Sequence, residues 1–182
     1  TAVIDKAGFD AFNWNGPGQI LGLFQPSHMQ YEADRAKDGK GEPSIADMTK
    51  AAITRLSHNP KGYVLMVEGG RVDHALHASN ASRALADTQA LDEAVADAAA
   101  MTDPKDTMIV GKPYTSHSFA NGPASICKDQ PDKKWLCDRQ DLTNVDTQAL
   151  GFKQPSLVPL FSETHGGEDV AIFAGGPGAN LF

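Results

Sequence analysis

The feature that most constrains the fold is an uninterrupted apolar run at residues 63–67 (YVLMV), which ends in Glu68-Gly69-Gly70. A continuous run of β-forming residues predicts a strand that is covered on both faces, as in a parallel sheet between helices. The two glycines let the chain turn at once into a helix. In open α/β sheets ligands bind at the carboxyl ends of the strands, where Glu68 lies.

The rest of the chain alternates helical and strand-like segments, which favours the α/β class. We expect one domain over residues 1–182, with a central, mostly parallel sheet flanked by helices. Ser44 predicts an N-cap for a helix at 45–58. Polar residues 30–44 are expected in an exposed loop, and residues 111–155 in an irregular surface region. Further strands are predicted at 106–110, 157–161 and 169–173.

The helix that follows Gly70 is expected to end at Asp103-Pro104. At about 100° per residue, its apolar stripe continues toward the N-terminus into Asp73 and His77, one turn apart. An acid and an imidazole at the buried end of a helix are costly unless something pairs with them.

Asp73 and His77 have the spacing at which a carboxylate oxygen and a ring nitrogen can meet one divalent ion. Glu68 could reach the same ion or a neighbouring one. His165, beside Gly166-Gly167, is a candidate third ligand, because glycine lets the backbone approach a ligand closely. His74 points about 100° away from Asp73 and receives no metal role. The alternatives are a solvated Asp with a hydrogen-bonded core His, and a loop His with one hydrogen bond.

Composition excludes several classes of protein. The 23 acidic and 16 basic residues give a net charge of -7 with no basic face, which argues against nucleic-acid or anionic-membrane partners. No apolar run reaches the ~18 residues of a membrane span. The first ten residues carry no secretion-signal pattern, so such a signal is expected to be removed or never present. No phosphate-binding loop, dinucleotide fingerprint or hydrolase elbow occurs.

The two cysteines, Cys127 and Cys137, bracket a polar loop. They are candidates for a disulfide if the protein is exported, and two free thiols otherwise.

Three collinear stretches together strongly resemble alkaline phosphatases. They are residues 21–32 (LGLFQPSHMQYE), 66–74 (MVEGGRVDH) and 163–173 (ETHGGEDVAIF). The resemblance implies that Asp73, His77 and His165 correspond to the three protein ligands of a zinc ion, and Glu68 to a ligand of a magnesium ion.

The same resemblance implies phosphomonoester hydrolysis through a phosphoserine intermediate, with two zinc ions and one magnesium ion per site. It further implies phosphate monoesters and inorganic phosphate as partners, a homodimer, and a periplasmic or extracellular location.

The chain also departs from the family pattern. The nucleophilic serine segment and the second zinc site of the family have no counterpart, and family sequence is expected to be missing at the Val110/Gly111 junction and at both ends. The chain would then be a partial domain, inactive alone, that arises from abridgement, proteolysis or truncation of a paralogue. A noncatalytic metal-binding protein and a related sulfatase or phosphodiesterase are the alternatives.

Overall fold

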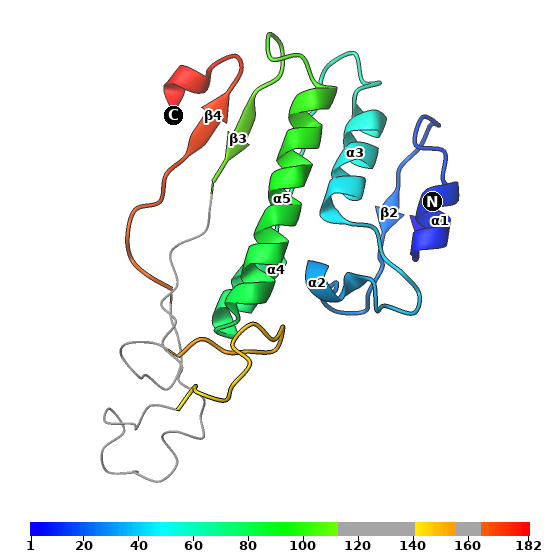
Figure 1. Cartoon of the computed structure of the whole chain (residues 1–182). Coiled ribbons are helices and arrows are strands. Elements are labelled where there is room, and N and C mark those ends of the chain that lie inside the picture. Colours follow the sequence, from blue (N-terminus) through cyan, green and yellow to red (C-terminus); the bar gives the residue numbers. More distant parts are fainter. Residues whose placement is uncertain (113–140, 156–164) are drawn as a thin grey trace.

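The computed structural model of the chain describes residues 1–112, 141–155 and 165–182. Helices α3, α4 and α5 form one layer, with short strands on either side of it (Figure 1). The elements in chain order are β1 (Ala2–Val3), α1 (Lys6–Ala11), β2 (Leu21–Gly22), α2 (Glu32–Arg35), α3 (Ile45–Leu56), α4 (Gly70–His77), α5 (Ala81–Met101), β3 (Ile109–Gly111), β4 (Phe173–Gly175) and the 3-10 helix η1 (Ala179–Leu181).

The described strands form two separate two-stranded sheets. Strands β1 and β2 are parallel, with Ala2 opposite Leu21, and β3 and β4 are antiparallel, with Val110 opposite Ala174. The mixture of helices and strands agrees with the α/β prediction, while the central parallel sheet stays a prediction. Strand β3 crosses the Val110/Gly111 junction, where missing family sequence also stays a prediction. The predicted strand 157–161 lies outside the described residues.

The prediction of a strand at 63–67 is wrong. No strand forms there, and the expected burial on both faces is wrong because Val64 is 96% and Met66 85% exposed. Tyr63 and Leu65, which alternate with them, are half-buried. The segment has the alternation of a strand with one covered face, but no backbone hydrogen bond joins it to another described segment.

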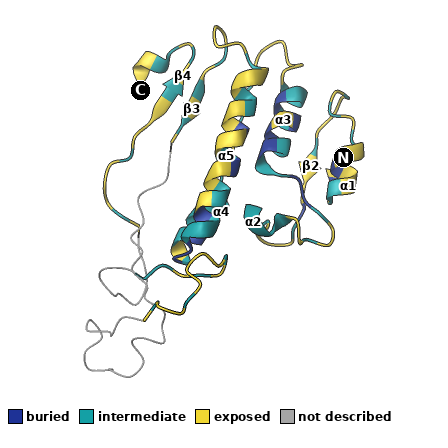
Figure 2. Cartoon of the chain, viewed as in Figure 1, coloured by how far each residue is buried: buried dark blue, intermediate teal, exposed yellow. Residues whose placement is uncertain are grey.

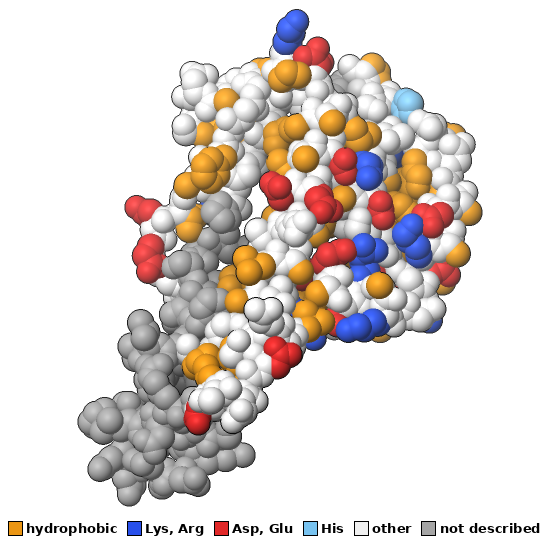
Figure 3. Space-filling view, in the orientation of Figure 1, with side chains coloured by type: hydrophobic (Ala, Val, Ile, Leu, Met, Phe, Trp, Pro, Cys, Tyr) orange, Lys and Arg blue, Asp and Glu red, His pale blue; other side chains and the backbone are white. Residues whose placement is uncertain are grey.

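Helix α3 begins where the sequence predicts. The Ser44 hydroxyl accepts from the Asp47 backbone N–H, and the Asp47 carboxylate accepts from the Ser44 N–H, which completes a capping box. The helix packs against α5, and Lys50 forms an ion pair with Asp97 of α5 at 3.2 Å. Charged side chains of both signs cover the outer face of this helical layer (Figure 3).

The prediction of a single helix from Gly70 onward is also wrong, because the chain forms two helices there, α4 and α5. Ser79 adopts a positive φ of 52°, and the Asn80 side chain accepts from the Arg83 N–H as the N-cap of α5. The break arises because Asn80 offers a local hydrogen bond that competes with continuation of the helix. It separates the metal-ligand candidates on α4 from the long apolar stripe of α5.

A small core joins the N-terminal elements to the helical layer. Val3, Phe9 and Phe24 are buried with Ala51 of α3, and the ring centroids of Trp14 and Phe9 are 4.8 Å apart. Figure 2 shows buried residues in dark blue on α3. Within the described ranges, no helix combines the length and apolar character that a membrane crossing needs.

The exposed loop predicted at 30–44 is also only partly correct. It contains helix α2 and the carboxylate of Glu42, which is only 2% exposed. Gln25 Nε2 and the Gln30 backbone N–H donate to Glu42 at 3.0 and 2.7 Å, and these hydrogen bonds allow its burial.

Candidate metal centre

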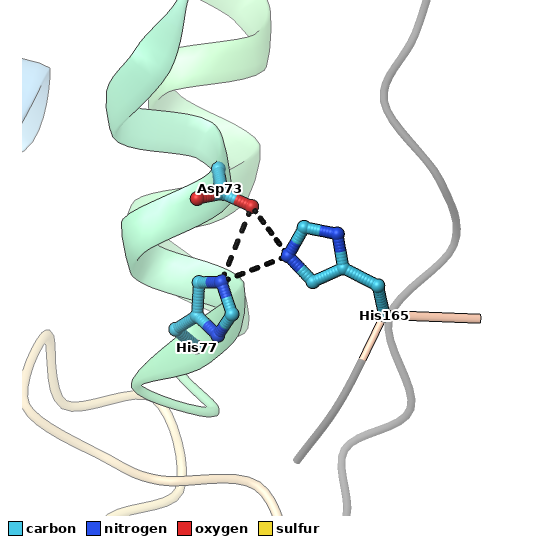
Figure 4. A group of neighbouring side chains, drawn as sticks. All are labelled: Asp73, His77 and His165. Atoms are coloured by element: carbon cyan, nitrogen blue, oxygen red, sulfur yellow. Dashed lines mark hydrogen bonds and ion pairs between the residues drawn. The ribbon is translucent and has the colours of Figure 1, made fainter.

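Three side chains that the sequence singles out converge beside α4. Asp73 and His77 lie one turn apart on this helix, and His165 approaches them from the segment that leads to β4 (Figure 4). Nε2 of His77 and Nε2 of His165 each lie 3.4 Å from Oδ1 of Asp73, and the two Nε2 atoms are 3.0 Å apart. We call these three residues the metal triad.

The triad has the dimensions of one face of a tetrahedral metal site. Ligand atoms ~2.0 to 2.2 Å from a zinc ion stand about 3.3 to 3.6 Å apart along the edges of a tetrahedron. The observed edges of 3.4, 3.4 and 3.0 Å are close to this size. Two imidazole nitrogens and one carboxylate oxygen are also a common donor set for zinc. The residues therefore fit a zinc-type ion.

The triad is partly exposed to solvent. The Asp73 side chain is 21% exposed, whereas those of His77 and His165 are 41% and 46% exposed. Among the described residues these three side chains converge, and three ligands occupy three of the four corners of a tetrahedron.

His74 lies outside the triad, as the helical arithmetic predicts. Its Nδ1 is 3.0 Å from Nη1 of Arg71, and its ring packs against that of His28 with centroids 4.3 Å apart. Burial, His28 and Arg71 together hold the pKa of His74 below its usual value, so the neutral ring is favoured.

Arg71 also connects α4 to α2. Its guanidinium lies over the ring of Tyr31 at 3.7 Å from the centroid, and that of Arg83 approaches the same ring at 5.2 Å. Such cation–π contacts stabilise the docking of one element on another. We call His28, Tyr31, Arg71 and His74 the Arg71 cluster; nothing in the sequence patterns pointed to it.

Asp87 of α5 completes the attachment of α2. Its carboxylate oxygens accept from the Glu32 backbone N–H at 3.2 and 3.3 Å, at the first residue of α2. Burial raises the pKa of Asp87 to about 6, and the hydrogen bond from Glu32 opposes this shift. A second contact joins the elements where Arg83 Nε donates to Asp34 at 2.8 Å.

Glu68 stands next to the start of α4 and does not join the metal triad. A Cβ at Gly70 would lie 3.3 Å from Glu68 Oε1, so the absent side chain at Gly70 leaves room for this carboxylate. Its role as a magnesium ligand stays a prediction. The candidate disulfide of Cys127 and Cys137 lies outside the described residues.

A distant loop fixes the corner between α4 and α5, which sequence reasoning missed. Asn80 Nδ2 donates to the Leu150 carbonyl at 2.8 Å, and the Ala81 N–H donates to Gln154 Oε1 at 2.6 Å. The Gln154 N–H in turn donates to the Ser79 carbonyl at 2.8 Å. The only sequence signal was the pair Ser79-Asn80, which is typical of a helix N-terminus.

Comparisons with known proteins identify the family of the chain. The sequence pattern of the alkaline phosphatase family matches residues 9–132 and 111–182, so the chain belongs to the alkaline phosphatase family.

Curated relatives are alkaline phosphatases. The tissue-nonspecific isozyme of Rattus norvegicus is 36% identical over 89% of this chain and 35% of its own length, and that of Felis catus is 37% identical over 91% and 36%. The alkaline phosphatase of Gadus morhua is 35% identical over 89% of this chain and 39% of its own length. The chain therefore spans little more than a third of these relatives.

Solved structures show the same fold. A cold-active alkaline phosphatase from Shewanella sp. superposes on all of this chain and on 55% of its own, with a TM-score of 0.67 and 22% identity. The alkaline phosphatase of Thermus thermophilus covers 71% of this chain at 31% identity, with 28% of its own chain matched and a TM-score of 0.58.

Proposed function

We propose that this chain forms part of a metal-dependent phosphomonoesterase of the alkaline phosphatase type, in which the metal triad holds a zinc ion. The observation that carries the proposal is the convergence of Asp73, His77 and His165 with the edge lengths of a tetrahedral site. Membership of the family supports the substrate class, phosphate monoesters with inorganic phosphate as product.

In this proposal each residue of the triad has a separate task. Asp73 supplies negative charge, and its partial burial strengthens its attraction for a cation. The imidazoles of His77 and His165 each direct Nε2 at the ion position. When bound, zinc would supply a Lewis acid that stabilises negative charge on an alcohol oxygen. Glu68, beside Gly70, would hold a magnesium ion close by.

The covalent step needs a group that we assign to family sequence outside these 182 residues. A phosphoserine intermediate requires a serine aligned with the phosphorus opposite the leaving oxygen. We propose that the chain is a partial domain with negligible turnover alone. The resemblance alone supports a second zinc ion, a homodimer and a periplasmic or extracellular location.

The test combines metal analysis with an activity assay. We expect the purified chain to retain about one zinc ion after dialysis, His165→Ala to lose it, and the matched control His58→Ala to retain it. His58 is exposed, bonds to Asn15 and is not a member of the metal triad. Hydrolysis of p-nitrophenyl phosphate by the chain alone should stay at background.

Two outcomes would overturn the proposal. Equal zinc content in the His165→Ala variant and the wild type would remove the metal triad from the metal site. Fast hydrolysis by the chain alone would show that the nucleophile lies within the 182 residues. Zinc binding without activity after complementation with the missing family sequence would favour the noncatalytic alternative.

A further inference from the structure

The chain that supplies His165 also bonds to the turn that follows α4, through Gln154. The Gln154 backbone N–H donates to the Ser79 carbonyl at 2.8 Å, and its side-chain Oε1 accepts from the Ala81 N–H at 2.6 Å. Ser79 and Ala81 come two and four positions after His77, the last residue of α4. Gln154 is therefore joined by two hydrogen bonds to the turn directly after one member of the metal triad.

This turn is a fixed point in the molecule. Ser79 is 0% exposed and Asn80 is 2% exposed. The Asn80 side chain donates to the Leu150 carbonyl at 2.8 Å, and Nη1 of Arg83 donates to the same carbonyl at 3.3 Å. A hydrogen bond between buried groups is costly to leave unmade. The turn thus holds the chain at 150–154 in one place.

His165 lies between two anchors along the chain. Gln154 precedes it by 11 positions, and Phe173, which pairs with Gly111 in the sheet of β3 and β4, follows it by 8. The effective concentration of a tethered group falls roughly as the −3/2 power of the tether length. By this scaling, a side chain that is tethered from one side only has an effective concentration roughly two to five times lower than one tethered from both sides.

We propose that Gln154 is a positioning residue for the third member of the metal triad. By bonding to the turn after α4, it holds the chain that carries His165 close to the helix that carries Asp73 and His77. Gln154 itself contacts neither the ion nor the substrate in this proposal. The inference rests on the proposed function for the zinc ion, but the placement of His165 beside His77 does not require the ion.

Zinc affinity, measured by competition with a chromophoric chelator, tests the proposal. Gln154→Ala deletes the oxygen that accepts from Ala81 and should lower the affinity about three- to tenfold. Gln154→Glu keeps an acceptor oxygen and should stay within about twofold of the wild type. The matched control is Gln148→Ala, at an exposed position of the same stretch. It should bind zinc as the wild type does, because alanine keeps the backbone N–H that bonds to Asp146.

The same substitution in the His165→Ala background separates positioning from a general structural role. Because Gln154 acts through His165, Gln154→Ala should change the residual affinity of Asp73 and His77 by less than about twofold there. If Gln154 instead supported α4 as a whole, the residual affinity would fall in this background as it does in the otherwise unchanged chain.

A nuclear Overhauser effect in the metal-free chain reports the placement of His165 without the ion. The rings of His77 and His165, with centroids 4.9 Å apart, should give a cross-peak that Gln154→Ala weakens and Gln154→Glu retains. The cross-peak between the rings of Phe9 and Trp14, 4.8 Å apart, should persist in every variant as evidence of folding. If Gln154→Ala loses it, Gln154→Asn, which is shorter than glutamine by one methylene, carries the same expectations in its place.

The outcomes separate this inference from the proposed function. Unchanged affinity and cross-peak in Gln154→Ala, an equal loss in the His165→Ala background, or an equal loss in Gln148→Ala would each overturn the inference alone. A wild type that binds no zinc, while the cross-peak still responds to the Gln154 variants as expected, would overturn the proposed function alone.

Discussion

Each of two sides of α4 carries a histidine, and the two histidines have different partners. His77 directs its Nε2 at an aspartate and at a second imidazole, whereas His74 packs against His28 and bonds to Arg71. Both imidazoles project from the same short helix, and they differ in their angular position around its axis. The spacing from Asp73 decides which histidine can share an ion with it.

The two sides of α4 also differ in the charged groups that they bring together. The metal triad gathers two imidazoles and a carboxylate oxygen into a triangle that suits a cation. The Arg71 cluster already contains its own cation, which lies over Tyr31 and beside His74. A second cation there would meet repulsion from Arg71, so the cluster is suited to attaching α2 and not to holding a metal.

The largest expected difference between the two sides is in zinc affinity, and it is tested by removing one side chain from each side. We expect Asp73→Ala to lower zinc affinity at least 100-fold, because it deletes the charged ligand. His74→Ala should change the affinity by less than about threefold, because His74 contacts Arg71 and His28 and not the triad. Competition with a chromophoric chelator measures both. Comparable losses in the two variants would contradict the division of α4 into two sides.

Tyr31→Leu tests the structural role of the Arg71 cluster. Loss of the ring removes the contacts of Arg71 and Arg83 and should lower the free energy of unfolding by about 1 to 2 kcal/mol. Zinc affinity should not change. Urea denaturation provides the measurement, and Tyr31→Phe is the control, since it keeps the ring and should retain most of the stability. A large fall in zinc affinity would connect the two sides.

Asp87→Asn should have the smallest effect, with a defined pH dependence. The carboxyl pKa is 3.8 ordinarily and about 6 in the fold, so the folded state binds more protons between these values and stability falls as the pH rises through them. The variant should raise the free energy of unfolding by at most about 1 kcal/mol at pH 8, a value reduced for the solvent that reaches this half-buried group. At pH 3.5 it should change little. A greater gain at pH 3.5 than at pH 8 would refute the assignment.

The sequence predicted those features that depend on local spacing. Ser44 and Asp47 lie three positions apart and form a capping box wherever the following residues are helical. Asp73 and His77 lie on the same face of α4 because they are four positions apart on a helix. His165 was a weaker candidate, because a loop histidine has no periodicity, and the family resemblance placed it with the other two.

The features that could not be predicted depend on contacts distant in sequence. The local cap of Asn80 starts the break at Ser79, but the contacts that hold this corner come from Leu150 and Gln154. The burial of Glu42 depends on Gln25 and Gln30. The 63–67 run was predicted to be a strand buried on both faces because its composition matches one. Composition indicates that a segment can form a strand, but a strand also needs a pairing partner, and no backbone hydrogen bond joins 63–67 to another described segment.

The separation of the triad along the chain determines when it can form. His77 and His165 are 88 positions apart, and the corner that orients α4 depends on Asn80 and Leu150, which are 70 apart. Long loops close late because their closure costs entropy before any contact offsets it. Asp73 and His77 can be in place on a finished helix while the third ligand is still far away. Tight zinc binding would therefore be possible only after the chain has folded, and zinc would not serve as the folding nucleus.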